Sequence, residues 1–150
     1  MGISESHASY IGRVGVDFCL SGDELDPGVV TSRIGIPPSV SARRGDARLG
    51  PQGREVGTHN IGLWRLSSEG AVLSKDINDH FAVLLDRLLP HQAVLREFAA
   101  AGEAFFIVFW ESSYLYAGTG PVIDSRAVSG AAALGAGMDF DIYQIDEPTV

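Results

Sequence analysis

The spacing of the apolar residues changes along the chain, and this spacing restricts what the chain can fold into. Between residues 14 and 20 every second side chain is apolar, which predicts a β-strand with one face on a core. Between residues 77 and 88 apolar side chains recur every three or four positions, which predicts an amphipathic helix. A chain with both patterns packs helices against a sheet. The strand residues are Val14, Val16, Phe18 and Leu20, and the helix residues are Ile77, Phe81, Leu84, Leu85 and Leu88.

Capping and turn residues place the remaining elements. Asp26 suits the N-cap of a short helix over 27–34, which ends before Gly35 and a Pro-Pro pair. Ser74 or Asp76 caps the long helix, and Pro90 predicts a kink or restart after it. A last helix over 125–134 follows Asp124. Further strands are predicted over 58–67, 105–110 and 140–143.

The predicted order of these elements is βαβααβαβ. It favours a two-layer α+β fold, with a mostly antiparallel or mixed sheet of four or five strands and three to four helices. The length of 150 residues suits one globular domain. Within that domain, residues 37–57 are rich in Pro, Gly and Arg and nearly free of large apolar side chains, so we expect a long, mobile surface loop.

Composition narrows the classes of partner. The formal net charge is −8, which opposes binding to nucleic acid or to anionic lipid, because both require phosphates to be neutralised. The one cysteine, Cys19, excludes an intramolecular disulfide and a cysteine-rich zinc site. Residues 1–20 have no apolar stretch typical of a signal peptide, and no stretch is long enough to span a membrane. We therefore expect a cytoplasmic protein that binds neither nucleic acid nor membrane.

Several local sequences together resemble a known family. The first is a run that contains Leu25-Asp26-Pro27, Val30-Thr31, Ile34-Gly35-Ile36 and Pro38. The others are Trp64, then His80 with Leu84-Leu85, Leu88 and Pro90, and finally Asp141-Ile142-Tyr143. These residues are similar to a small bacterial family known as the domain of unknown function number 4279. The resemblance extends over nearly the whole chain. It implies a fold, and it brings no catalytic residues with it.

Motifs that would establish a chemistry are absent, including a phosphate-binding loop, a nucleophile elbow and a paired-histidine zinc helix. His80 and Asp76 are four residues apart and could share a helix face, with His59 as a third group if the fold brings it near. Asp17, Asp139 and Asp141 could bind a divalent cation. For His80 we favour packing beside the apolar stripe, and for Asp139 and Asp141 the solvated face of an end strand. Cys19 could be a nucleophile, but in the middle of a strand we favour a small hydrophobic role for its thiol. We predict no catalytic residue, no metal and no cofactor.

The faces of the sheet give a stronger hypothesis about binding. If helices cover Val14, Val16, Phe18, Phe105, Ile107, Phe140 and Ile142, the other face carries aromatic, acidic and arginine side chains, as recognition surfaces do. The predicted binding residues on it are Arg13, Asp17, Trp64, Trp110, Asp141 and Tyr143, beside Phe106 and Val108. Trp110 is the predicted centre and contact residue. If Trp110 proves fully buried under a helix and its truncation unfolds the protein, the sheet-face hypothesis fails. A covering loop or a second subunit is the alternative.

Three functions remain open. The first is a non-catalytic binding or protein-interaction domain, and its acidic charge suits a basic partner, as in immunity proteins by analogy. The second is a small enzyme with a site near His59, His80 or the acidic strand ends. The third is a structural homodimer formed through the uncovered face.

Overall fold

The computed structural model describes residues 11–113 and 120–146. Its main sheet has five strands in the order β2-β5-β1-β6-β7. Neighbouring strands are antiparallel except for β6 and β7, which are parallel, so the sheet is mixed and the predicted α+β class is confirmed. The strands are β1 (Ile11–Gly22), β2 (Val40–Ala42), β5 (Gly62–Ser67), β6 (Glu103–Ser113) and β7 (Gly137–Ile145).

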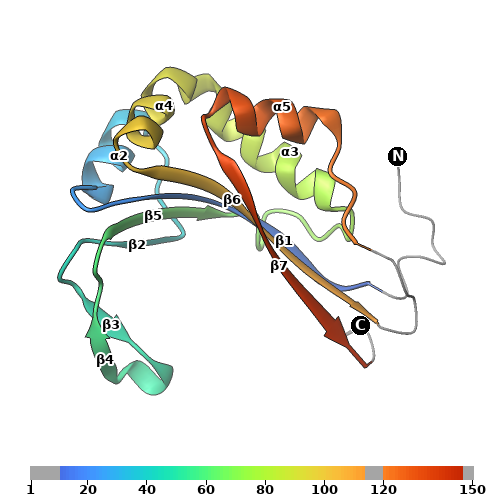
Figure 1. The fold of residues 1–150 in the computed structure, drawn as a ribbon, viewed down its shortest axis with the longest axis horizontal. Helices are drawn as coiled ribbons and strands as arrows, with labels where there is room; N and C mark the ends of the chain where they lie inside the picture. The colour runs from blue at the N-terminus through green and yellow to red at the C-terminus, as the bar shows by residue number, and fades with distance from the viewer. Residues whose placement is uncertain (1–10, 114–119, 147–150) are drawn as a thin grey trace.

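The α-helices lie together on one side of this sheet (Figure 1). They are α2 (Pro27–Ile34), α3 (Ile77–Leu88), α4 (Gln92–Ala101) and α5 (Ser125–Ala133). Helix α5 connects the parallel strands β6 and β7, as a parallel pair requires a crossover. Among the described residues, no helix is long and apolar enough to cross a membrane.

Aspartate side chains cap three helices as predicted. The side chains of Asp26, Asp76 and Asp124 accept hydrogen bonds from the amides of Gly28, Asn78 and Ala127 at 2.9, 3.0 and 2.8 Å. Gly35 follows α2 with φ of 71°, a left-handed conformation that favours glycine. Pro90 lies in the short 3₁₀ helix η2 (Leu89–His91), so the predicted restart between α3 and α4 is also confirmed.

The segment 37–57 differs from the prediction, because it is not without regular structure. It contains β2, and it begins a separate two-stranded sheet formed by β3 (Ala47–Leu49) and β4 (Glu55–Thr58), with the 3₁₀ turn η1 (Pro51–Gly53) between them. This small sheet projects away from the helices (Figure 1). All residues of β3 and β4 are exposed, so these strands lack the apolar alternation that reveals a strand in sequence.

The core lies between the sheet and the helices. Phe18, Trp64, Phe81 and Phe106 form its aromatic centre, and the ring centroids of Phe18 and Phe106 are 5.1 Å apart. Phe105 and Ile107, which were expected under the helices, are not in this core: Phe105 is 37% exposed and Ile107 only half-buried. Register explains the difference, because Phe106 pairs with the buried Phe18 and must share its face.

Candidate functional site

The face of the main sheet opposite the helices carries the candidate site, and we call it the open face. Cross-strand pairing defines it, because Gly15 pairs with Phe109, and Phe109 pairs in turn with Asp141. No described helix covers this face (Figure 1). Its side chains come from Arg13 and Asp17 of β1, Arg65 and Ser67 of β5, Phe105, Ile107, Phe109 and Glu111 of β6, and Asp139, Asp141 and Tyr143 of β7.

Two of the predicted binding residues do not belong to the open face. Trp64 is fully buried and Trp110 is 2% exposed, and both are in the hydrophobic core with Phe106 and Val108. Trp64 donates its indole N–H to Thr31 Oγ1 of α2 at 3.0 Å. The predicted placement of these four side chains is therefore wrong. The hypothesis that a recognition surface is centred on Trp110 is therefore also wrong.

The other four predicted residues, Arg13, Asp17, Asp141 and Tyr143, do lie on the open face. Phe140 and Ile142 point to the helix side as predicted, since they pair with Val108 and Trp110. Both are nevertheless nearly half exposed, because β7 is at the edge of the sheet. Whether any of these residues binds a partner stays a prediction.

Phe109, and not Trp110, lies at the centre of the open face. The guanidinium carbon of Arg13 lies 4.5 Å from the centroid of the Phe109 ring, a cation–π distance. On the other side, the Phe109 and Tyr143 rings are 5.1 Å apart. These three side chains form a row across β1, β6 and β7, which we call the aromatic row. It combines a cation with two partly exposed rings, and arginine and aromatic side chains are enriched at protein interfaces.

A bulge in β1 positions the Arg13 end of this row. The β1–β6 register shifts between Ile11 and Val14, and the freed Arg13 amide donates to Glu111 Oε2 at 3.0 Å. Bulges redirect side chains in this way. The sequence of β1 contains glycines but no other signal that predicts the bulge.

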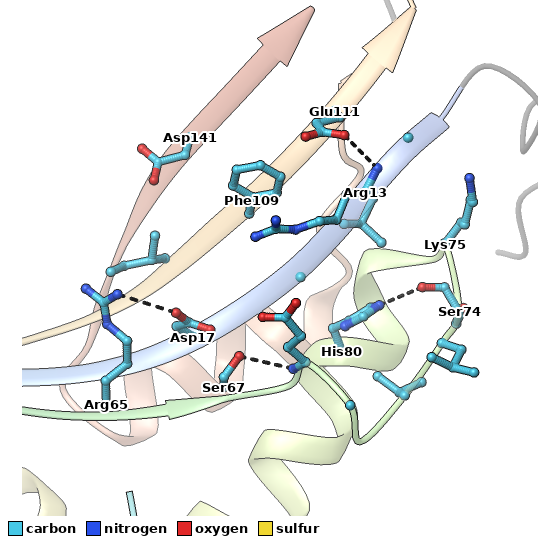
Figure 2. A pocket seen from close by; sticks show the side chains of 18 residues that line it. Arg13, Asp17, Arg65, Ser67, Ser74, Lys75, His80, Phe109, Glu111 and Asp141 are labelled. Atoms are coloured by element: carbon cyan, nitrogen blue, oxygen red, sulfur yellow. Dashed lines mark hydrogen bonds and ion pairs between the residues drawn. The ribbon is translucent and has the colours of Figure 1, made fainter. Parts of the chain in front are cut away.

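A groove of about 760 Å³ runs along β1 beside the aromatic row (Figure 2). Residues 12–15 and Asp17 of β1 form one side, with Phe109 of the aromatic row beside them, and residues between 69 and 75, in the connection from β5 to α3, form the other. Lys75 joins the two sides, since its Nζ donates to the Ile11 carbonyl at 2.5 Å. Leu73 stands at the rim with 93% of its surface exposed. The sequence could not predict this groove, because it depends on how the connection between β5 and α3 is folded.

Charged side chains extend from the groove across the open face. Arg65 Nη1 lies 3.7 Å from Asp17 Oδ2, a partly exposed ion pair. Burial raises the pKa of the neighbouring Cys19 thiol, and Arg65 opposes this rise only in part. No ion pair involving Asp139 or Asp141 occurs among the described residues. The open face thus has an excess of unpaired acidic groups at β7.

His80 belongs to a buried polar network at the inner end of the groove. Its Nε2 donates to the Ser74 carbonyl at 2.6 Å, so Nδ1 accepts the Ser68 hydroxyl at 2.8 Å. Ser68 Oγ also accepts the Val16 amide at 2.9 Å. A serine bound to histidine can be a nucleophile, but Ser68 is fully buried and no substrate can reach it. The network instead fixes the connection between β5 and α3 against β1.

The predicted partners of His80 are elsewhere. Asp76 caps α3, and His59 precedes the Gly62 end of β5, whereas Ser68 and His80 are at its other end. Asp17 and Asp139 are on β1 and β7, with Ile107 of β6 between them, and Asp17 is paired with Arg65. The described residues contain no group of three or more His, Cys, Asp or Glu that could hold a metal ion.

Comparison with protein families gives a match over nearly the whole chain. The family described as "Domain of unknown function (DUF4279)" matches residues 12–145, which include every described element apart from Ile11 at the start of β1. No curated protein and no solved structure matches the chain.

Proposed function

Because this chain belongs to the DUF4279 family, whose description gives no activity, we propose its function from the geometry of the open face: it is a non-catalytic protein-interaction domain that binds a basic protein partner. The aromatic row is the observation that carries this proposal. It consists of two partly exposed rings and the Arg13 guanidinium, on a sheet face that no described helix covers.

The physical argument starts from the exposed apolar side chains. An apolar side chain that faces water does not gain the free energy that burial provides. Aromatic side chains that are exposed together on one face are therefore typical of a docking surface. Tyr143 is 50% exposed and Phe105 is 37% exposed. A partner that covers them removes apolar area from water, which supplies most of the driving force for association.

Charge indicates the class of partner. The acidic groups Asp139 and Asp141 are exposed beside the aromatic row, and the whole chain carries a net charge of −8. Unpaired carboxylates attract a basic surface over long distances and accelerate its encounter with the domain. Arg13 is already stacked on Phe109 and Asp17 is paired with Arg65, whereas Asp139 and Asp141 have no ion-pair partner among the described residues.

A crosslinking experiment tests this proposal. A photo-reactive amino acid replaces Tyr143 on the open face or, as a control, Val128, which is exposed on α5. In extracts of the organism that encodes the chain, we expect a protein to crosslink from position 143 and not from position 128. That protein, purified, should bind directly, and Phe109→Ala should weaken its affinity about tenfold. Crosslinking from position 128 alone, or an affinity that Phe109→Ala leaves unchanged, would contradict the proposal.

A further inference from the structure

Strand β7 forms a long free edge of the main sheet. It is the last strand in the order β2-β5-β1-β6-β7 and pairs only with β6 among the described residues. It has nine residues, whereas β2 at the opposite edge has three. An unprotected edge strand presents unpaired backbone N–H and C=O groups that can pair with another chain.

The side chains of β7 leave both faces of this edge accessible. Phe140 and Ile142 on the helix side are 46% and 48% exposed, and Tyr143 on the open face is 50% exposed. Natural proteins usually protect such an edge with proline, charged side chains or a bulge. Gly137–Ile145 contains no proline, and its register with β6 has no shift, so its only such protection is the pair of acidic side chains Asp139 and Asp141.

The charges on this edge disfavour a second copy of the chain and favour a basic segment. In the antiparallel register that pairs the whole of β7 with its own copy, Asp141 lies opposite Asp141 of that copy, and like charges directly opposite destabilise a strand pair. Asp139 and Asp141 are two residues apart, so they point to the same face. Lys or Arg at every second position of an added strand would meet both carboxylates.

From these observations we propose that β7 binds an extended basic segment of the partner by strand addition. Backbone hydrogen bonds to the β7 edge supply the general affinity, and alternate side chains supply the specificity. Basic side chains of the segment face Asp139 and Asp141, and the apolar side chains between them cover Phe140 and Ile142. This inference rests on the proposed function, and it identifies the part of the partner that is recognised.

The experiment uses the whole chain and a synthetic peptide of alternating valine and lysine with blocked ends. We expect binding to slow hydrogen exchange at the backbone amides of β7, and a peptide with methyl groups on alternate backbone nitrogens to lose that effect. The methylated peptide keeps the same charge and side chains, so it separates strand addition from electrostatic attraction. Equal binding of both peptides, or protection outside β7, would overturn the inference.

Two variants with the same change of charge provide the control for specificity. Asp141→Lys should weaken binding of the unmodified peptide about tenfold, and Asp23→Lys, exposed in the turn after β1, should not. Equal effects of the two variants would overturn the inference. Slower hydrogen exchange at the β7 amides when the protein alone is concentrated would also overturn the inference, because a second copy of the chain would then occupy the edge. If the peptide does not bind to β7 but a protein crosslinks from position 143, strand addition is rejected and the proposed function stands.

Discussion

At the scale of single residues, the hydroxyl of Ser68 satisfies two buried groups at once. It accepts a hydrogen bond from the Val16 amide and donates one to His80 Nδ1. Because the site is fully buried, water does not replace the hydroxyl as the partner of these two groups. Ser68→Ala should lower the free energy of unfolding by about 1–3 kcal/mol, because two buried polar groups lose their partner. Urea denaturation measures this change. Ser129→Ala, on the exposed side of α5, is the matched control and should shift stability by no more than about 0.5 kcal/mol.

Cys19 provides a pH-dependent prediction. Burial raises the pKa of its thiol above that of an exposed cysteine. The folded chain therefore keeps the proton at a pH where the unfolded chain loses it, so stability is fully present below the pKa of the unfolded thiol and falls as the pH rises past it. We expect iodoacetamide at pH 8 to alkylate Cys19 more slowly in the folded chain than in urea, as followed by mass spectrometry. Equal rates would show that the thiol is not protected.

At the scale of elements, the Asp26 cap can be separated from its ion pair. The Asp26 carboxylate accepts the Gly28 amide and also lies 3.1 Å from Arg43 Nη2. Asp26→Ala should cost about 1 kcal/mol of stability, because the first turn of α2 loses its cap. Arg43→Ala removes only an exposed ion pair and should cost less. Equal losses in thermal melts of the two variants would mean that the ion pair, not the cap, holds this end of α2.

Helix ends were predictable from the sequence because capping is local. Asp26, Gly35 and Asp124 each act within a few residues of the helix that they delimit, so spacing alone locates them. The face of β6 was not predictable by the same means. Every position of 105–110 is apolar, and only the pairing of Phe106 with Phe18 decides which side is buried. The placement of Trp110 was wrong for this reason.

In the candidate site, too, features that depend on a local pattern were predictable, and features that depend on pairing between distant segments were not. Alternation within β1 and β7 correctly placed Arg13, Asp17, Asp141 and Tyr143 on one face. Phe109 was missed, because its role depends on the phase of β6. The groove and the Ser68–His80 network join β1 to the connection between β5 and α3, and no spacing in the sequence reports contacts over such separations.

At the scale of the whole molecule, the small β3–β4 sheet is the part least tied to the core. Its strands pair only with each other, and all their residues are exposed. Segments with few buried apolar contacts open most readily to proteases. We expect trypsin to cut first at Arg43, Arg44, Arg48 or Arg54, as identified by mass spectrometry of early digests. A first cut at Arg87 or Arg96, in α3 and α4, would contradict this expectation.

Cleavage in this segment should not separate the two fragments. Strand β1, from the N-terminal fragment, lies between β5 and β6 of the C-terminal fragment and pairs with both. Phe18 and Leu20 of β1 are fully buried in the core, so dissociation would expose that core to water. Size-exclusion chromatography of the nicked protein should therefore give one peak containing both fragments. Separate elution without denaturant would show that β1 contributes less to the main sheet than its pairing indicates.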